Sequence, residues 1–352
     1  MRSFLSKALP TMIAALFSVA SLVSAENKVA YDQGYEVDET QLKGIYNTSA
    51  SIDVESSWDF YANGSFIYWF AKEQGLELGT FFPTTTPLNL KPINFPFTYK
   101  PGFKVGMGTH FNHDDWNVYA QYTRLMFRKG HYVTAPITSY TIHPFWNMVP
   151  LSDLSARWKL NFNMFDLECA RPYFVGKKIS FTPHTGLRGG WINQRLVLGG
   201  IDATSVFHED HIVRSNSWLL GIKAGLDTNW NIGGGFRFIG NAAGSLLYQH
   251  FKIHDLQSFY SLSVPTIKIP LLNTRDRKGQ ITPNFEAALG MGWGTYLDNN
   301  NWHFDLTAAY EFSYYWNQNK MRSLKDANSS FIDGDSGDLM FHGLTMNARV
   351  DF

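Results

Sequence analysis

The chain of 352 residues has little cysteine, little net charge and few long apolar runs. Its single cysteine, Cys169, excludes an intramolecular disulfide framework and argues against a cysteine-based zinc site, while a bridge between two chains stays open. Basic and acidic residues number 30 each, so the formal charge of zero gives no electrostatic reason to expect nucleic-acid binding. Beyond residue 25, no window reaches the about eighteen consecutive apolar residues of a spanning helix. If the remainder of the chain spans a membrane, it does so as a closed barrel.

The first 25 residues have the layout of a secretory signal peptide. Arg2 and Lys7 precede an apolar stretch that ends on the small residues Val23-Ser24-Ala25. An uncleaved anchor helix is the alternative, but no stop-transfer cluster of charges follows the stretch. The predicted signal peptide is therefore residues 1–25, and a polar segment follows it at 26–57.

Aromatic residues are abundant, at 16% of the chain, while the charged share of 17% is below the usual quarter. In 281–297 one face of the alternating pattern is apolar and the other is small or polar, and the scheme repeats over 302–316 after a short turn. Runs this long exceed the about five or six residues of strands in globular sheets. Trp302 and Trp316 stand at strand ends, where interface girdles belong. The pattern therefore favours an all-β transmembrane barrel over a soluble β-sandwich. Together with the signal peptide at 1–25, it predicts an N-terminal periplasmic or plug-like segment at 26–57 and an outer-membrane β-barrel at 58–352.

The same alternation along the chain predicts an antiparallel up-and-down barrel of ten strands, with short periplasmic turns and long extracellular loops. Twelve strands stay open, because 258–269 also alternates and 26–56 contains Ile52 and Val54. The predicted strands are 58–74, 98–111, 116–128, 157–171, 178–198, 214–230, 234–252, 280–297, 302–316 and 339–352. The long connections are 75–97, 129–156, 199–213, 253–279 and 317–338.

The last strand ends in a pattern of its own. Apolar residues alternate with polar ones up to a terminal aromatic residue, which resembles the assembly signal of bacterial outer-membrane proteins. This resemblance implies recognition by the barrel assembly machinery. The apolar positions are Leu344, Met346, Ala348, Val350 and Phe352.

Four stretches resemble the Legionella-type major outer membrane protein family, which includes the MOMP-like proteins of environmental chlamydiae. They are YKPGFKVGMG at 99–108, HDDWNVY at 113–119, FDLE at 165–168 and GIKAGLDTNW at 221–230. The resemblance runs from about residue 58 to the end and implies a porin or porin-like surface protein of a Gram-negative, intracellular bacterium. The related proteins of pathogenic chlamydiae are rich in cysteine and cross-linked, so the single Cys169 puts a disulfide-network role in doubt here.

Charged residues at inward positions of the strands are predicted to line a pore and to tune its selectivity. The alternative is that opposite charges pair across a plugged interior. Barrels of ten or twelve strands leave a narrow bore at best, since wide aqueous channels need about sixteen. The predicted pore-lining residues are Lys104, Lys159, Arg188, Lys223, Asp227, Arg237, Glu286, Asp305, Glu311 and Arg349.

Motifs for metal binding or catalysis are weak. Asp333, Asp335 and Asp338 alternate as calcium ligands could, but no bidentate glutamate follows, so a solvated acidic turn is favoured. The sequence has no nucleophile elbow and no phosphate-binding loop with its lysine. We therefore expect no enzyme activity, no catalytic residues, no metal and no cofactor.

The sequence thus predicts an outer-membrane porin or porin-like channel for passive diffusion of small hydrophilic solutes or ions. A structural or adhesive surface barrel with a closed lumen is the main alternative, and a transporter for apolar ligands is a third. The expected partners are outer-membrane lipid and the barrel assembly machinery. A homo-oligomer and a contact with a host surface stay open, and nucleic acid is not expected.

Overall fold

A computed structural model of the chain describes residues 54, 60–83, 90–111, 115–136, 140–146, 148–176, 178–298, 301–322 and 337–352. The chain divides into two compact units, 1–48 and 49–352, and all the described residues belong to the second. The predicted signal peptide lies outside them, as does the segment 26–57 apart from Val54. Within the described ranges, no helix is long and apolar enough to cross a membrane.

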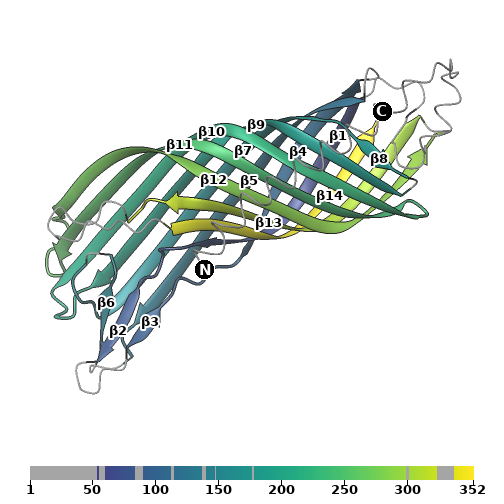
Figure 1. The fold of residues 1–352 in the computed structure, drawn as a ribbon. Helices are drawn as coiled ribbons and strands as arrows, with labels where there is room; N and C mark the ends of the chain where they lie inside the picture. The colour runs from purple at the N-terminus through teal and green to yellow at the C-terminus, as the bar shows by residue number, and fades with distance from the viewer. Residues whose placement is uncertain are drawn as a thin grey trace, which may run out of the picture. The chain divides into compact units, whose positions relative to one another are not determined.

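Ten antiparallel strands form a closed barrel (Figure 1). The last strand pairs with the first, and each remaining barrel strand pairs with the barrel strands that come before and after it in the chain. The ring order is β1-β4-β5-β7-β9-β10-β11-β12-β13-β14. Their bounds are β1 Phe60–Glu73, β4 Tyr99–Phe111, β5 Trp116–Thr134, β7 Asp153–Ala170, β9 Ile179–Ile201, β10 Phe207–Gly233, β11 Phe236–Ser261, β12 Ile269–Leu297, β13 Trp302–Asn319 and β14 Gly337–Asp351.

Four short strands lie beside the barrel strands. β2 (Gly79–Pro83), β3 (Lys91–Ile93) and β6 (Tyr140–Pro144) make a separate three-stranded sheet, and β8 (Tyr173–Val175) pairs with the start of β9. The connections after β4, β7, β10 and β12 lie at one end of the barrel, called here the turn end. The connections after β1, β5, β9, β11 and β13 lie at the opposite end, called the loop end.

The prediction of ten strands is confirmed, and the alternative of twelve is wrong for the described chain. The alternating run at 258–269 is the tip of a hairpin in which β11 and β12 stay paired as far as Phe259 and Ile269. Likewise, most of the expected long connection 199–213 is strand, because β9 and β10 stay paired as far as Ile201 and His208. Pairing the backbone in this way satisfies its amide and carbonyl groups well past the barrel's middle.

The polarity of the strands inverts halfway along the barrel. On β7 the inward side chains are apolar from Trp158 to Met164 and acidic at Asp166 and Glu168, while the outward ones change from Lys159 and the asparagines after it to apolar residues. The outer faces of β9, β10 and β11 change in the same way, whereas their inner faces at the loop end mix apolar residues with buried polar ones such as Gln194, Ser217 and Gln249. The turn-end half is therefore apolar outside and polar inside, as a lipid-facing barrel requires, and the loop-end half has an apolar core and a polar surface.

Two aromatic girdles bound the apolar outer band. Trp218 contacts Tyr248 at 5.7 Å between ring centroids and pairs with Trp191 across β10 and β9. Trp230 contacts Phe238 at 6.0 Å nearer the turn end. Trp218 and Trp230 are 12 positions apart on β10, which at about 3.3 Å per residue and a tilt of about 40° separates the girdles by about 30 Å. That distance matches the hydrocarbon thickness of a bilayer.

Candidate functional site

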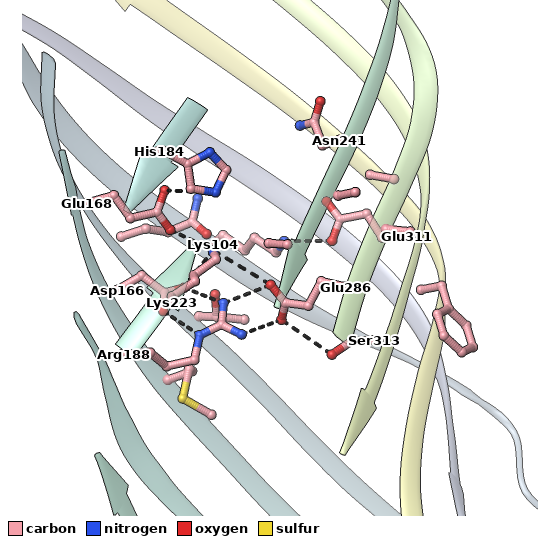
Figure 2. Close-up of a pocket in the computed structure, with 18 of the residues that line it drawn as sticks. Lys104, Asp166, Glu168, His184, Arg188, Lys223, Asn241, Glu286, Glu311 and Ser313 are labelled. Carbon is pink, nitrogen blue, oxygen red and sulfur yellow. Dashed lines mark hydrogen bonds and ion pairs between the residues drawn. The ribbon is translucent and has the colours of Figure 1, made fainter. Parts of the chain in front are cut away.

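The lumen contains a cavity of about 220 Å³ in the polar half of the barrel (Figure 2). Its walls are inward side chains of β1, β4, β5, β7, β9, β10, β11, β12 and β13, so residues distant in sequence converge there. A volume of this size holds on the order of ten water molecules. The charged residues that line it are Lys104, Asp166, Glu168, His184, Arg188, Lys223, Asp227, Glu286 and Glu311.

Arg188 is the centre of this cluster, and its side chain is only 3% exposed. It donates from Nε and Nη2 to Asp166 at 2.5 and 2.9 Å, and from Nη1 and Nη2 to Glu286 at 2.7 and 2.8 Å. A further bond of 2.7 Å runs from Nη1 to Asn284 Oδ1, so all five N–H donors of the guanidinium are used. β9 and β12 are separated in the sheet by β10 and β11, so the contact with Glu286 crosses the lumen.

Two lysines complete the network. Lys223 Nζ donates to Glu168 Oε1 at 2.5 Å and lies 3.6 Å from Glu286 Oε2. Lys104 Nζ donates to Glu311 Oε2 at 2.6 Å, which joins β4 to β13 across the two intervening strands. These ion pairs span the bore and narrow it, as the closed-interior alternative anticipated.

The cavity nevertheless has excess negative charge. Its lining includes three cationic side chains and five carboxylates, a net charge of −2 with His184 counted as neutral. Asp227 lies 3.6 Å from His184 Nδ1 and is 39% exposed, the largest exposed fraction among the paired carboxylates of the lining. Because an excess of negative charge in a narrow bore attracts cations and repels anions, this lining favours cations over anions.

An aromatic layer closes the cavity on its loop-end side. Phe162 of β7 lies 5.8 Å from Tyr315 of β13 and 4.9 Å from Phe341 of β14, and these strands are on opposite sides of the ring. Trp158 extends the layer toward Phe95, whose ring is 6.1 Å away in the connection between β1 and β4. This connection therefore packs against the inner wall at the loop end.

The turn-end part of the lumen is polar. Arg237 donates to both oxygens of Asp305 at 2.5 and 2.8 Å, and Arg349 donates to Asp351 while its guanidinium lies 3.7 Å over the ring of Tyr61. His303 Nδ1 lies 3.0 Å from Asp351 Oδ2. Charged and hydrogen-bonding groups thus continue from the cavity to the turn end.

Nine of the ten predicted pore-lining residues lie on the inner face, six of them around the cavity and three nearer the turn end. Lys159 is the exception, and its prediction was wrong. It pairs with Arg128 and Arg195 on the outer face, whereas its neighbour Trp158 is fully buried inside. The physical reason is the polarity inversion, because above the girdle the outer surface faces water and accepts charge.

Sequence reasoning missed Asp166 and Glu168 as lumen residues, although both hold the cationic centres of the cluster. A signal was present, since they follow Trp158, Leu160, Phe162 and Met164 at the same alternate positions of β7. Only the position of the inversion was unknown.

The other predicted sites are placed as follows. Leu344, Met346 and Phe352 are exposed. The ring of Phe352 lies 5.7 Å from that of Trp302, tilted by 34°, and its backbone amide donates to Phe60 O. Ala348 and Val350 are half-buried. Asp333 and Asp335 lie outside the described residues. Asp338 accepts hydrogen bonds from Tyr314 Oη at 2.6 Å and Asn317 N at 2.7 Å.

Among the described residues, no group of three or more histidine, cysteine, aspartate or glutamate side chains is arranged to hold a metal ion. Cys169 is exposed on the outer face of β7.

Comparisons with solved structures give outer-membrane proteins at low identity. The outer membrane protease OmpT from Escherichia coli is 10% identical with a TM-score of 0.38, and the match covers 87% of this chain and 99% of that one. Ail, the attachment invasion locus protein of Yersinia pestis, is 9% identical with a TM-score of 0.24, covering 82% and 97%. The Pseudomonas putida toluene transporter TodX is 9% identical with a TM-score of 0.28, covering 88% and 94%.

Comparison with curated protein sequences gave no match. The family model described as Legionella pneumophila major outer membrane protein precursor matches residues 50–352, which is most of the chain and all ten barrel strands. Outer-membrane barrels have short periplasmic turns and long extracellular loops, so the turn end of this barrel is periplasmic and its loop end is extracellular. The chain belongs to the Legionella major outer membrane protein family and is a β-barrel of the bacterial outer membrane.

Proposed function

We propose that this barrel is a narrow, cation-preferring channel for small hydrophilic solutes or ions, and that the present conformation is its closed state. The observation that carries the proposal is the cavity of about 220 Å³ inside the bore, whose lining has a net charge of −2. A barrel that needed only rigidity could fill this level with apolar side chains, as it does around Phe162 and Trp158. The proposal includes no catalytic step.

Two barriers close the bore in this conformation. The first is the pair of cross-lumen contacts, Arg188 to Glu286 and Lys104 to Glu311. The second is the aromatic layer around Phe162. Conduction therefore requires side chains of both levels to change rotamer, and ten strands limit the open bore to small solutes. The expected signature is a low and intermittent conductance.

Planar-bilayer recording on the refolded chain tests the proposal. In a potassium chloride gradient, the sign of the reversal potential should report a preference for the cation. Asp227→Asn removes one exposed lumen carboxylate and should move the reversal potential toward zero. The matched control is Asp298→Asn in the turn after β12, which makes the same chemical change outside the lumen and should leave the potential unchanged.

The second candidate is a surface barrel with a permanently closed lumen. It is favoured by the aromatic layer and by Gln194, which donates across the bore to Glu73 at 3.1 Å and to Gln318 at 2.8 Å. Silent bilayers containing correctly folded, heat-modifiable protein would support this candidate and reject the channel. A conductance that prefers anions would reject the role given to the lumen carboxylates.

A further inference from the structure

The outer surface just beyond the extracellular girdle has a continuous row of basic side chains. Six successive strands, from β5 to β12, each place one of them at directly paired positions of the sheet. At about 4.8 Å between strands the row is about 24 Å wide. This basic row consists of Arg128, Lys159, Arg195, Arg214, His254 and Arg275.

The row places like charges directly opposite one another, which destabilises a sheet. Among the described residues, its lysine and arginines make no ion pair with a carboxylate. The nearest outward carboxylates on these strands, Asp153 and Asp210, lie farther from the membrane and accept hydrogen bonds from Tyr132 and Lys268. The repulsion is thus uncompensated within this part of the protein, and an external anion would relieve it.

The surface below the row is layered in the order that an amphiphile would need. The girdle residues Trp191 and Trp218 pair with each other, and one outward step above them Asn193 pairs with Asn161 and with Asn216. The basic row is the next outward step. Side-chain amides both donate and accept hydrogen bonds, so the asparagines suit hydroxyl-rich groups between an apolar and an anionic part.

The row covers only one side of the barrel. On β13, β14 and β1 the outer face ends at the extracellular side with Tyr314, Met340 and Lys72, which pair in that order. A general device for solubility would surround the whole rim, so the one-sided row indicates a specific site.

We propose that the basic row binds the phosphorylated headgroup of a glycolipid in the outer leaflet. Its acyl chains would lie on the apolar band below Trp191 and Trp218, its sugar hydroxyls at the asparagines, and its phosphates against the arginines. The inference depends on residence in the outer membrane and is independent of the channel proposal.

Native mass spectrometry of the refolded full chain, titrated with lipid A as a doubly phosphorylated glucosamine lipid, tests the proposal. A cation at an anionic lipid surface is worth about fivefold in affinity, so the triple variant Arg195→Gln, Arg214→Gln, Arg275→Gln should bind about 100-fold more weakly. The matched control replaces three exposed lysines elsewhere, Lys72→Gln, Lys91→Gln and Lys178→Gln, and should bind as the native chain does.

Heat-modifiable mobility confirms that both triple variants fold, and it should be the same in both variants as in the native chain. Lipid A stripped of its phosphates should bind the native chain weakly. Equal binding by the two triple variants, or no dependence on the lipid phosphates, would overturn the proposal. So would capture of heparin without capture of lipid, which would assign the row to an acidic polysaccharide, or saturation by millimolar inorganic phosphate, which would make it a site for small anions.

Discussion

Replacing Arg188 with methionine should destabilise the barrel severely, because it breaks a buried ion pair from one side only. The methionine keeps most of the length of the side chain, so the change removes charge and hydrogen bonds rather than volume. Asp166 is then left with its nearest cation, Lys223, at 3.8 Å, and Glu286 keeps Lys223 at 3.6 Å and Ser313 at 3.3 Å. Removing one partner of such a pair costs about 3–5 kcal/mol.

Guanidinium unfolding in lipid vesicles, followed by tryptophan fluorescence, measures this loss. For a loss of about 4 kcal/mol and a slope of roughly 2–6 kcal/mol per molar, the midpoint should fall by on the order of 1 M. Arg157→Met, an exposed arginine of β7, is the matched control and should change stability by less than about 0.5 kcal/mol.

A compensated variant separates electrostatics from packing. Arg188→Met combined with Asp166→Asn and Glu286→Gln removes the stranded charges and should recover more than half of the lost stability. If the single and compensated variants lost the same stability, the cost would come from packing, and the account of Arg188 as the centre of an ionic network would be refuted.

Three further predictions concern other parts of the barrel. Replacing Ile222, in the lipid-facing band, with arginine should lower the free energy of unfolding by about 2–4 kcal/mol. The same replacement at Ile267 in the extracellular connection, which is 61% exposed against 62% for Ile222, should leave it almost unchanged. Unfolding in lipid vesicles compares the two variants. Asp202 lies in the β9–β10 turn beyond the membrane, where desolvation opposes ionisation but hydrogen bonds from its turn lower its pKa. The stability that ionised Asp202 contributes is therefore present above the unfolded pKa of about 3.9 and is lost as the pH falls through the folded pKa. The difference in unfolding midpoint between the native chain and Asp202→Asn should narrow as the pH falls from about 6 to about 2.5. A difference that widens would contradict this. Deleting Phe352 should slow the appearance of the heat-modifiable form in cells severalfold while refolding in detergent is unchanged, and equal slowing in detergent would assign the effect to its contact with Trp302.

Most of the fold could be predicted from alternation because lipid and lumen impose opposite polarities on adjacent residues. The stretch 281–297 illustrates this, since its apolar face holds Leu289 and Met291, both strongly exposed on the outer surface, and its other face holds Glu286 in the lumen. The extracellular hairpins could not be delimited in the same way. Beyond the membrane both faces of 253–279 meet water or loops, so alternation weakens although backbone pairing continues to Phe259 and Ile269.

The lumen residues were predictable as a set but not as partners. Period-two alternation places Arg188 and Glu286 on inner faces, yet it contains no information on which strands face each other across the bore. That contact depends on closure of the ring by β14 and β1 and on the register of every strand between. For this reason the sequence left both a wet pore and a charge-paired interior open, and in this structure the charges pair around a small cavity.

Lys159 shows why charge alone does not identify the lumen. A charged side chain avoids lipid, so within the apolar band its position reports the inner face. Above the girdle the same argument reverses, because the interior there is filled by Trp158 and its neighbours and the outer surface is wet. Lys159 is therefore evidence for where the membrane ends on β7, and its alignment with Arg128 and Arg195 marks that boundary on two adjacent strands. A residue misplaced by the alternation rule thus locates the level at which the barrel leaves the apolar layer of its membrane.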